Sequence, residues 1–310
     1  MLTTISGNPV SKYSFGTMQF GGTADETASG EMYHACRRAG INFFDTAHGY
    51  TEGRSETFLG RLLADERDDI FVATKCAYRG WDAEKMRAEI DESLSRLGVD
   101  VVDLLYIHQW DPNGTLEDAL SVIGEAVSAG KARYVGLSNF AAWKTMKARE
   151  IARGMGFDIQ VLQPMYNLVK RQVEVEILPM ALSEGFAVCP YSPLGGGLLT
   201  GKYAAGVEGR LTVDDRYNAR YGPDWMRETA TDLAEHAAIV GASPATLAVA
   251  WVARHPGIWG PIISARNAIQ LMPSLAAMKL EMDDELYGEI TGLSQAPAPD
   301  NDRLEETGSS

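Results

Sequence analysis

The sequence predicts one α/β domain, a (β/α)8 TIM barrel in which parallel strands alternate with helices. Short apolar runs of strand length alternate with amphipathic helical stretches along most of the 310 residues. We count eight such runs, and this number favours a closed barrel over an open sheet. No break in composition marks a second domain. Residues 1–294 therefore form the predicted barrel, and we expect the Pro-rich, acidic tail at 295–310 to be disordered.

The predicted strands are short apolar runs, each followed by a loop. They cover residues 14–19, 41–45, 70–75, 101–107, 133–138, 159–163, 186–191 and 261–264. In a barrel of parallel strands the carboxyl ends meet at one face, where reactive side chains are usually placed. The residues at the ends of these runs are therefore the first candidates for a functional site.

Helices are predicted between the strands, at 27–38, 55–64, 82–98, from 115, at 141–153 and 173–184, twice between 224 and 260, and at 268–278. Several ends carry capping residues. Asp82, Thr115 and Ser243 stand at N-cap positions, Pro244 follows in a first turn, and Gly98 stands at a C-terminal end. The segment 192–223 contains Gly, Asp and Arg and is predicted to be a long loop.

Composition and charge narrow the class of function. The formal net charge is −14, which disfavours binding to nucleic acid or to an anionic membrane. No apolar run approaches the ~20 residues that span a bilayer, and the N-terminal residues do not resemble a signal peptide. Cys36, Cys76 and Cys189 are dispersed and show neither metal-ligand spacing nor a disulfide framework. We therefore expect a cytoplasmic protein without a metal site.

Four reactive side chains fall at or just past the ends of consecutive predicted strands. The run INFFDTAHGY carries Asp45 and Tyr50, IFVATK ends in Lys75, and VVDLLYIH ends in His108. A phenol is a weak acid at neutral pH, and a nearby ammonium is expected to lower its pKa. A carboxylate keeps that ammonium charged, and a histidine can donate to a carbonyl oxygen. Together the four residues predict a proton-donating site for a carbonyl substrate.

Each of these residues has a structural alternative when it is considered alone. Asp45 and Lys75 could form an ordinary ion pair at strand ends, and His108 could be a hydrogen-bonded core histidine. Their occurrence at successive barrel positions favours a catalytic role.

The motifs resemble the aldo-keto reductase family over residues 14–290. DTAHGY is similar to the family's DTAxxY signature, and VATK, LLYIH, GLSNF, QPMYNL, YSPLGGGLLTGKY and PIISARNAIQL resemble its later blocks in order. The family is an (α/β)8 barrel that reduces carbonyls with NADPH. The resemblance implies that Tyr50 is the proton donor, that Lys75 and Asp45 tune it, and that His108 orients the substrate.

The resemblance also assigns Ser138, Asn139 and Gln163 to the nicotinamide carboxamide and Tyr191 to stacking on its ring. Amide side chains offer both donors and acceptors, and an aromatic face can hold a flat heterocycle. The structural alternatives are a strand-to-helix cap at 138–139, a hydrogen-bonded interior glutamine, and core packing of the tyrosine. The full set that the resemblance assigns to the cofactor is Gly16, Thr17, Met18, Asp45, Ser138, Asn139, Gln163, Tyr191, Ser192, Pro193, Leu194, Gly197, Leu199, Gly201, Lys202, Arg210, Ser264, Ala265, Arg266 and Gln270.

NADPH is the preferred cofactor, with NAD possible. The chain has no GxGxxG motif, and GGLLTGK at 196–202 departs from a P-loop because Tyr203 replaces the required Ser or Thr. By resemblance this segment closes over the pyrophosphate. Arg266 is the candidate clamp for a 2′-phosphate, unless it caps a helix or pairs with a surface acid. Ser264, Pro273 and Ser274 depart from the family pattern near the adenosine.

The substrate side is predicted to be largely aromatic, which suggests an apolar or ring-bearing carbonyl. His48 could instead help an anionic or polyhydroxylated substrate, and Tyr78 and Trp81 could serve only to pack their loop. Sugars, aliphatic aldehydes, ketones and pyridoxal-like rings all remain open. The predicted substrate-binding residues are Met18, Phe20, His48, Tyr50, Tyr78, Trp81, His108 and Trp110.

The leading interpretation is an oxidoreductase that interconverts a small carbonyl compound and an alcohol. One rival is a non-catalytic nicotinamide-nucleotide-binding regulatory subunit on the same fold, as in channel β subunits. A metal-dependent barrel hydrolase is the other, and it would need a cluster of His and acidic ligands at strand ends. The sequence leaves the oligomeric state open.

Overall fold

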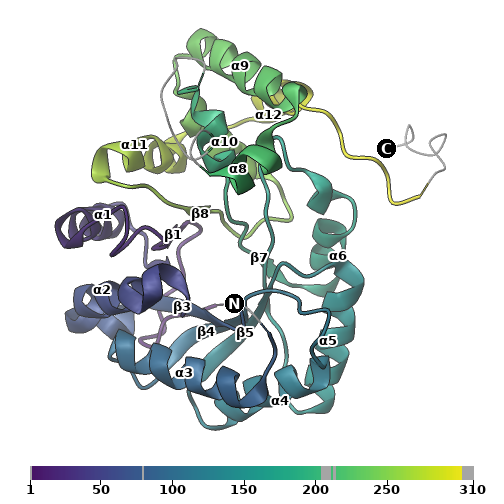
Figure 1. The fold of residues 1–310 in the computed structure, drawn as a ribbon. Helices are drawn as coiled ribbons and strands as arrows, with labels where there is room; N and C mark the ends of the chain where they lie inside the picture. Colours follow the sequence, from purple (N-terminus) through teal and green to yellow (C-terminus); the bar gives the residue numbers. More distant parts are fainter. Residues whose placement is uncertain (1, 79, 204–210, 212–213, 302–310) are drawn as a thin grey trace.

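The computed structural model describes residues 2–78, 80–203, 211 and 214–301. Figure 1 shows a curled sheet of parallel strands with helices α1 to α6 around its outside and α8, α9, α10 and α12 gathered at the top of the view. Residues 295–301 form no helix or strand and lead away from the barrel, and the rest of the predicted tail lies outside the described residues.

Eight strands form one sheet in the order β7-β6-β5-β4-β3-β2-β1-β8, and all their pairings are parallel. Backbone contacts between the two end strands close the ring: Ile262 N donates to Pro190 O at 2.9 Å, and Trp259 N donates to Val188 O at 2.8 Å. The predicted (β/α)8 barrel is therefore confirmed. The strands are β1 (Ser14–Gly16), β2 (Phe43–Asp45), β3 (Phe71–Cys76), β4 (Val102–Ile107), β5 (Ala132–Ser138), β6 (Val161–Gln163), β7 (Ala187–Val188) and β8 (Ile262–Ile263).

A helix lies close to each predicted range, and two further helices, α8 and α12, were not predicted. Their bounds are α1 (Glu26–Arg38), α2 (Arg54–Leu63), α3 (Ala83–Leu97), α4 (Leu116–Ser128), α5 (Ala142–Gly154), α6 (Ile177–Glu184), α8 (Asp215–Tyr221), α9 (Asp224–Ile239), α10 (Pro244–Arg254), α11 (Ala268–Ala276) and α12 (Asp284–Gly292). The described residues also contain five short 3-10 helices, namely η1 (Tyr50–Gly53), η2 (Ala64–Asp69), η3 (Gln172–Glu174), η4 (Gly195–Thr200) and η5 (Ala277–Lys279).

The predicted caps occupy their positions. The side chain of Asp82 accepts from Lys85 N at 2.8 Å, and that of Ser243 accepts from Thr246 N at 3.0 Å. Gly98 has φ 67°, a left-handed conformation that commonly ends a helix and that glycine adopts readily. Thr115 stands at the N-cap of α4, but its side chain makes no capping hydrogen bond.

Two predicted segments differ from the structure. The helix expected at 173–184 begins only at Ile177, because Pro179 lacks an N–H and is accepted in the first turn of a helix rather than in its interior. The segment 192–223 is not simply a loop, since it contains η4 and α8. Asp214 starts α8 by accepting a hydrogen bond from Arg216 N at 3.0 Å.

The alternation of side chains along the strands creates two cores. Phe44, for example, packs between the sheet and the helices, whereas its neighbour Phe43 belongs to the cluster inside the barrel. The inner cluster also contains Leu2 and Val10, which come from the N-terminal segment. This segment folds back on itself through an antiparallel bridge between Thr3 and Pro9 and closes the base of the barrel.

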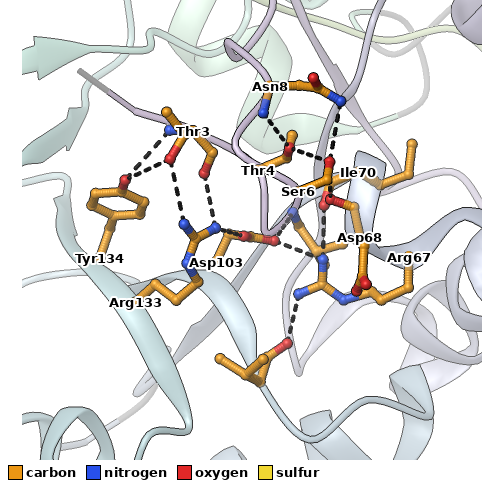
Figure 2. Close-up of polar contacts among 12 residues, drawn as sticks. Thr3, Thr4, Ser6, Asn8, Arg67, Asp68, Ile70, Asp103, Arg133 and Tyr134 are labelled. Carbon is orange, nitrogen blue, oxygen red and sulfur yellow. Dashed lines mark hydrogen bonds and ion pairs between the residues drawn. The ribbon is translucent and has the colours of Figure 1, made fainter.

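A buried charge network ties this N-terminal segment to the barrel (Figure 2). Asp103 has no exposed surface, and it pairs with Arg67 at 2.8 Å and with Arg133 at 2.5 Å. It also accepts from Val72 N at 2.9 Å. Arg133 in turn donates to Thr3 O at 2.8 Å. The Asp103 carboxylate thus links β3, β4 and β5, and through Arg133 it also links them to the N-terminal segment that closes the base of the barrel.

We expect Asp103→Ala to lower the free energy of unfolding by about 3–5 kcal/mol, because it leaves two partly buried guanidinium groups without their counter-ion. Denaturant unfolding measures the change. Asp91→Ala is the matched control, since Asp91 pairs with Lys131 but its side chain is 61% exposed. The control should cost less than about 1 kcal/mol. Similar losses in the two variants would contradict a special role for the buried network.

Candidate active site

The predicted site residues meet at the carboxyl end of the barrel because they continue the inward-facing side of their strands. The apolar residues that precede them on this side belong to the inner cluster: Phe43, Phe71, Ala73, Leu104, Tyr106 and Val161. With a side-chain period of two, the next inward positions are Asp45, Lys75, His108 and Gln163. All four are buried.

Lys75 is the centre of the contacts. Its Nζ donates to Asp45 Oδ1 at 2.5 Å, to Thr46 O at 2.7 Å and to Tyr50 Oη at 3.5 Å. The other carboxylate oxygen of Asp45 accepts from Gln163 Nε2 at 2.8 Å. The ion pair is therefore fixed on both sides, and its ammonium points at the phenol.

Tyr50 is held by an unusual turn. It begins η1, in which Thr51 and Glu52 have φ values of 47° and 58°. Thr51 Oγ1 donates to Phe20 O at 2.7 Å and accepts from Ser55 N at 3.0 Å, which fixes the turn against the loop after β1. The ring of Tyr50 lies edge-on to the ring of His108, with centroids 5.7 Å apart. The four predicted catalytic residues are thus brought together.

Burial dominates the electrostatics of this group. Burial raises the pKa of Asp45 despite the neighbouring ammonium of Lys75. Burial alone would lower the pKa of Lys75, but the charges of Asp45 and Tyr50 outweigh it and raise that pKa. Burial also raises the pKa of Tyr50, and Lys75 offsets this only in part. The expected lowering of the Tyr50 pKa is therefore wrong for this structure, and the phenol stays protonated at neutral pH.

His108 is neutral in this environment. Burial, with the nearby ammonium of Lys75, lowers the pKa of its imidazole from 6.5 to about 3. Its Nδ1 is buried and makes no hydrogen bond to any described residue. A buried ring nitrogen without a partner is costly, so it fits a site that receives a ligand oxygen or donor.

The residues assigned to a carboxamide also form one group. Asn139, with φ 61°, donates from Nδ2 to Ser138 Oγ and to His108 O, both at 3.0 Å. Its Oδ1 accepts from the hydroxyl of Tyr191 at 2.8 Å. Ser138 and Asn139 do not cap α5, whose N-cap residue is Ala141, so the structural alternative for this pair is wrong. Gln163 is hydrogen-bonded inside the barrel as its alternative stated, to Asp45.

The glycine-rich segment allows a close approach of backbone to side chains. Gly195, Gly196 and Gly197 have φ values of 57°, 66° and 99°, and a Cβ at Gly196 would lie 2.7 Å from Tyr217. Lys202 forms no ion pair among the described residues, and its Nζ lies 4.8 Å from the ring centroid of Tyr203. Such backbone and a cation without a counter-ion fit an anionic group.

The other predicted contacts of this segment have mixed positions. Ser192 adopts φ 63°, and its Oγ accepts from Gly196 N at 3.3 Å. Pro193 and Leu199 are buried, whereas Leu194, Gly197 and Gly201 are partly exposed. Arg210 lies outside the described residues.

The two sides of the seam between β1 and β8 carry further predicted contacts. On one side Gly16 ends β1, the hydroxyl of Thr17 donates to Asp45 O at 3.2 Å, and Met18 is exposed. On the other side Ser264 is exposed and Ala265 is buried. Because β1 pairs with β8, these residues lie beside one another.

Arg266 fits an anion better than its alternatives. Asn267, not Arg266, caps α11, by accepting from Gln270 N at 2.9 Å. Within the described part of the chain Arg266 makes neither an ion pair nor a hydrogen bond. Gln270 lies exposed in the first turn of α11. A partly exposed guanidinium without a counter-ion is suited to a phosphate.

The predicted substrate wall is only partly formed as expected. Tyr78 is 44% exposed, and its ring centroid lies 4.8 Å from that of His108. Trp110 is partly exposed beside the ring of Trp81. Phe20 and Trp81 are buried in the main core, so the structure places them behind the wall. For Trp81 this agrees with the alternative of loop packing, because its Nε1 donates to Gln109 O at 3.2 Å.

Two charged residues near this wall were not predicted. Lys85 and Glu89, four residues apart on α3, line a small cavity together with His48 and Tyr78. The only sequence signal is the acid Glu89 on the apolar face of a helix, three residues after Met86 and directly before Ile90, both of which are buried.

Residues 12–295 match the profile of the aldo/keto reductase family. This chain belongs to that family. Relatives include a probable voltage-gated potassium channel subunit beta from Oryza sativa subsp. japonica, 33% identical over 88% of this chain and 89% of the relative. L-glyceraldehyde 3-phosphate reductase of Escherichia coli (strain K12) is 31% identical over 77% of this chain and 75% of its own length.

Norsolorinic acid reductase B of Aspergillus parasiticus (strain ATCC 56775 / NRRL 5862 / SRRC 143 / SU-1) is 36% identical over 61% of this chain and 56% of its own length. Aldo/keto reductases generally bind nicotinamide cofactors. Three features are consistent with such a group in this chain: the glycine-rich segment, and His108 Nδ1 and Arg266, which have no partner among the described residues.

Among the described residues no group of three or more His, Cys, Asp or Glu side chains could hold a metal ion. No single described helix is long and apolar enough to cross a membrane, although α9 and α10 pass the same test as a pair bent by 100°.

We predict that the imidazole of His108 does not titrate between pH 5 and 8, because its pKa is lowered to about 3. The folded state then binds fewer protons than the unfolded state between about pH 3 and 6.5, so His108 makes stability rise with pH across that window. NMR of the histidine side chains, assigned with His108→Gln, measures the titration. A midpoint near 6.5 would mean that the imidazole is solvated in the folded protein.

Proposed function

We propose that this aldo/keto reductase is an NADPH-dependent oxidoreductase that reduces an aldehyde or ketone to an alcohol, or catalyses the reverse reaction. The observation that carries the proposal is the buried Lys75–Asp45 pair, with Lys75 Nζ 3.5 Å from Tyr50 Oη. A protonated phenol at the mouth of a barrel, with an ammonium behind it, is built to give one proton to a developing oxyanion.

The bound cofactor supplies the hydride that forms the new C–H bond at the carbonyl carbon. The protein supplies the proton, which passes from Tyr50 Oη to the carbonyl oxygen. Lys75 then stabilises the tyrosinate that remains, and Asp45 keeps Lys75 charged in its buried position. His108, neutral at working pH, offers a ring nitrogen to the substrate oxygen without competing for the proton.

The preference between NADPH and NADH is inferred from two basic side chains. Arg266 and Lys202 form no ion pair with an acid among the described residues, although the chain as a whole carries a net charge of −14. In such a chain, cations without acidic partners are the natural positions for the phosphates of a dinucleotide. We therefore propose NADPH rather than NADH.

A small carbonyl compound is the proposed partner, and the cytoplasm the proposed location. Cys36, Cys76 and Cys189 are all buried and free. Unpaired cysteines in a chain of this size suit a reducing compartment, where disulfides are rare.

A second candidate is a regulatory subunit that binds a nicotinamide nucleotide without turnover. The similarity to the rice channel subunit beta over 88% of this chain favours it. The grouping of Asp45, Tyr50, Lys75 and His108 in one site favours the enzyme. A panel of aldehydes and ketones, with NADPH and NADH consumption followed optically, separates the two candidates.

We expect Tyr50→Phe to lower kcat by ~10²–10⁴-fold, because the variant loses the general acid. Cofactor affinity should change little, since the phenyl ring and its contact with His108 remain. The measurement is kcat and the cofactor Kd on the best substrate from the panel.

Tyr287→Phe is the control, because Tyr287 packs on Trp251 away from the strand ends. If Tyr50→Phe keeps more than about a tenth of the wild-type kcat, a shortfall too small for loss of a general acid, Tyr50 is not the donor.

Arg266→Ala should weaken NADPH binding roughly ten- to a hundredfold and NADH binding much less. A hydrogen bond between charged groups is worth about 1.5–3 kcal/mol, and only NADPH carries the 2′-phosphate. Titration of protein fluorescence or calorimetry gives both Kd values. Arg227→Ala, on the exposed face of α9, is the control. Equal losses for the two cofactors would show that Arg266 does not bind the phosphate.

A further inference from the structure

A cavity of about 140 Å³ adjoins the candidate active site. Its lining consists of His48, Gly49, Lys75, Tyr78, Lys85 and Glu89. Two of these residues also belong to the site. Lys75 Nζ lies 3.5 Å from Tyr50 Oη, and the ring of Tyr78 lies 4.8 Å from that of His108. A substrate whose carbonyl lies at Tyr50 can therefore extend an arm toward this cavity.

Glu89 is the unusual member of the lining, because it is only 8% exposed. Its Oε2 accepts from the backbone N of Ala77 at 2.7 Å, which holds the carboxylate at the end of β3. Ala77 itself has φ 62°, a conformation rare for a residue with a Cβ. The carboxylate and the strand end thus fix one another.

The second oxygen of Glu89 remains available to a ligand. Oε1 lies 3.7 Å from Lys85 Nζ and 4.0 Å from His48 Nδ1, and both distances exceed a hydrogen bond. Among the described residues Oε1 makes no hydrogen bond. The Glu89 side chain is only 11% exposed, so a ligand that fills the cavity removes water from Oε1, and a donor on that ligand would replace the lost hydrogen bonds.

Two side chains that can donate hydrogen bonds, His48 and Lys85, line the same cavity. His48 Nε2 contacts Glu92 Oε2 at 2.8 Å, which orients the ring so that Nδ1 is the nitrogen nearer to Glu89. The ammonium of Lys85 lies 3.7 Å from Oε1. The cavity therefore presents one strong acceptor close to two groups that can donate.

This arrangement discriminates among chemical groups. A hydroxyl both donates and accepts, so it can satisfy Glu89 and a neighbouring donor at once. An anionic group would meet the like charge of Glu89, and an alkyl group would displace water from Oε1 without replacing its hydrogen bonds. The volume of about 140 Å³ exceeds the ~30 Å³ of one water molecule, so a short hydroxylated carbon arm fits.

We propose that the cavity is a hydroxyl-binding subsite and that Glu89 selects hydroxylated aldehydes and ketones over their alkyl counterparts. The inference rests on the proposed function, because it names the substrate class of that same site. Glu89 is a specificity residue here, and it takes no part in proton transfer to the carbonyl.

The test compares substrates in which a methyl group replaces each hydroxyl. Hydroxyacetone is paired with 2-butanone, and glyceraldehyde with 2-methylbutanal, with rates expressed per free carbonyl. We expect wild-type kcat/KM to favour the hydroxylated member by about tenfold or more. Glu89→Gln should lower kcat/KM for that member by roughly ten- to a hundredfold, the worth of a hydrogen bond to a charged acceptor. It should change kcat/KM for the alkyl member by less than about threefold, the size of effect expected when a substitution removes no specific contact.

Asp91→Asn is the matched control. Asp91 lies on the same helix and pairs with Lys131, but its side chain is 61% exposed and does not line the cavity. It should leave the selectivity ratio unchanged. Gln at position 89 keeps an oxygen for Ala77 N, and thermal unfolding checks the fold. If that variant does not fold, Lys85→Met, at the half-exposed edge of the cavity, should lower the ratio instead.

Two outcomes overturn the subsite and leave the proposed function intact. One is a wild-type enzyme that reduces 2-butanone and 2-methylbutanal as well as the hydroxylated compounds. The other is an Asp91→Asn variant that loses as much selectivity as Glu89→Gln. By contrast, absence of turnover with all four compounds and with the wider carbonyl panel overturns the proposed function itself, and the subsite with it.

Discussion

The buried ion pair between Lys75 and Asp45 is the interaction on which the rest of the site depends. Both side chains are almost completely buried, so either charge alone would be strongly unfavourable in its place. Gln163 holds the second oxygen of the carboxylate, and Thr46 O accepts from the ammonium. Because these contacts leave Lys75 Nζ only one further direction, the phenol of Tyr50 receives it. Stability of the barrel end and acidity of the site are therefore linked.

Barrel closure determines what surrounds this pair. Parallel strands with a side-chain period of two bring the acid, the ammonium, the imidazole and the amide to one face. Pairing of β1 with β8 then sets the loop after Gly16 beside the loop that carries Arg266. The rim also contains residues in the left-handed region, such as Ala77 and Asn139. Strained backbone of this kind is commonly found at functional sites, where the surrounding structure enforces it.

Predictions from sequence were accurate where the controlling interaction is local. The caps at Asp82 and Ser243 and the turn at Gly98 depend on contacts within three or four residues, and the structure has all three. The start of α6 was misplaced because the effect of Pro179 on the first turn was overlooked. The helices within 192–223 were missed because turn residues there are compatible with short helices as well as with loops. The sequence did not show that Phe20 lies in the core rather than on the substrate wall, because its contact with the ring of Phe15 exists only in the folded chain.

The sequence by itself determined the barrel, the strand ends and the identity of the four residues that meet there, because periodicity and motif order are properties of the chain. Only the tertiary structure decided the protonation of those residues. The Asp45–Gln163 contact joins positions 118 residues apart, and the low pKa of His108 comes from burial that no local pattern reports. The proposed role of Glu89 likewise depends on the tertiary structure, because its cavity is enclosed by the loops after two different strands and by one helix. Burial raises or lowers each pKa according to everything that packs around the group, and that packing exists only in the folded chain.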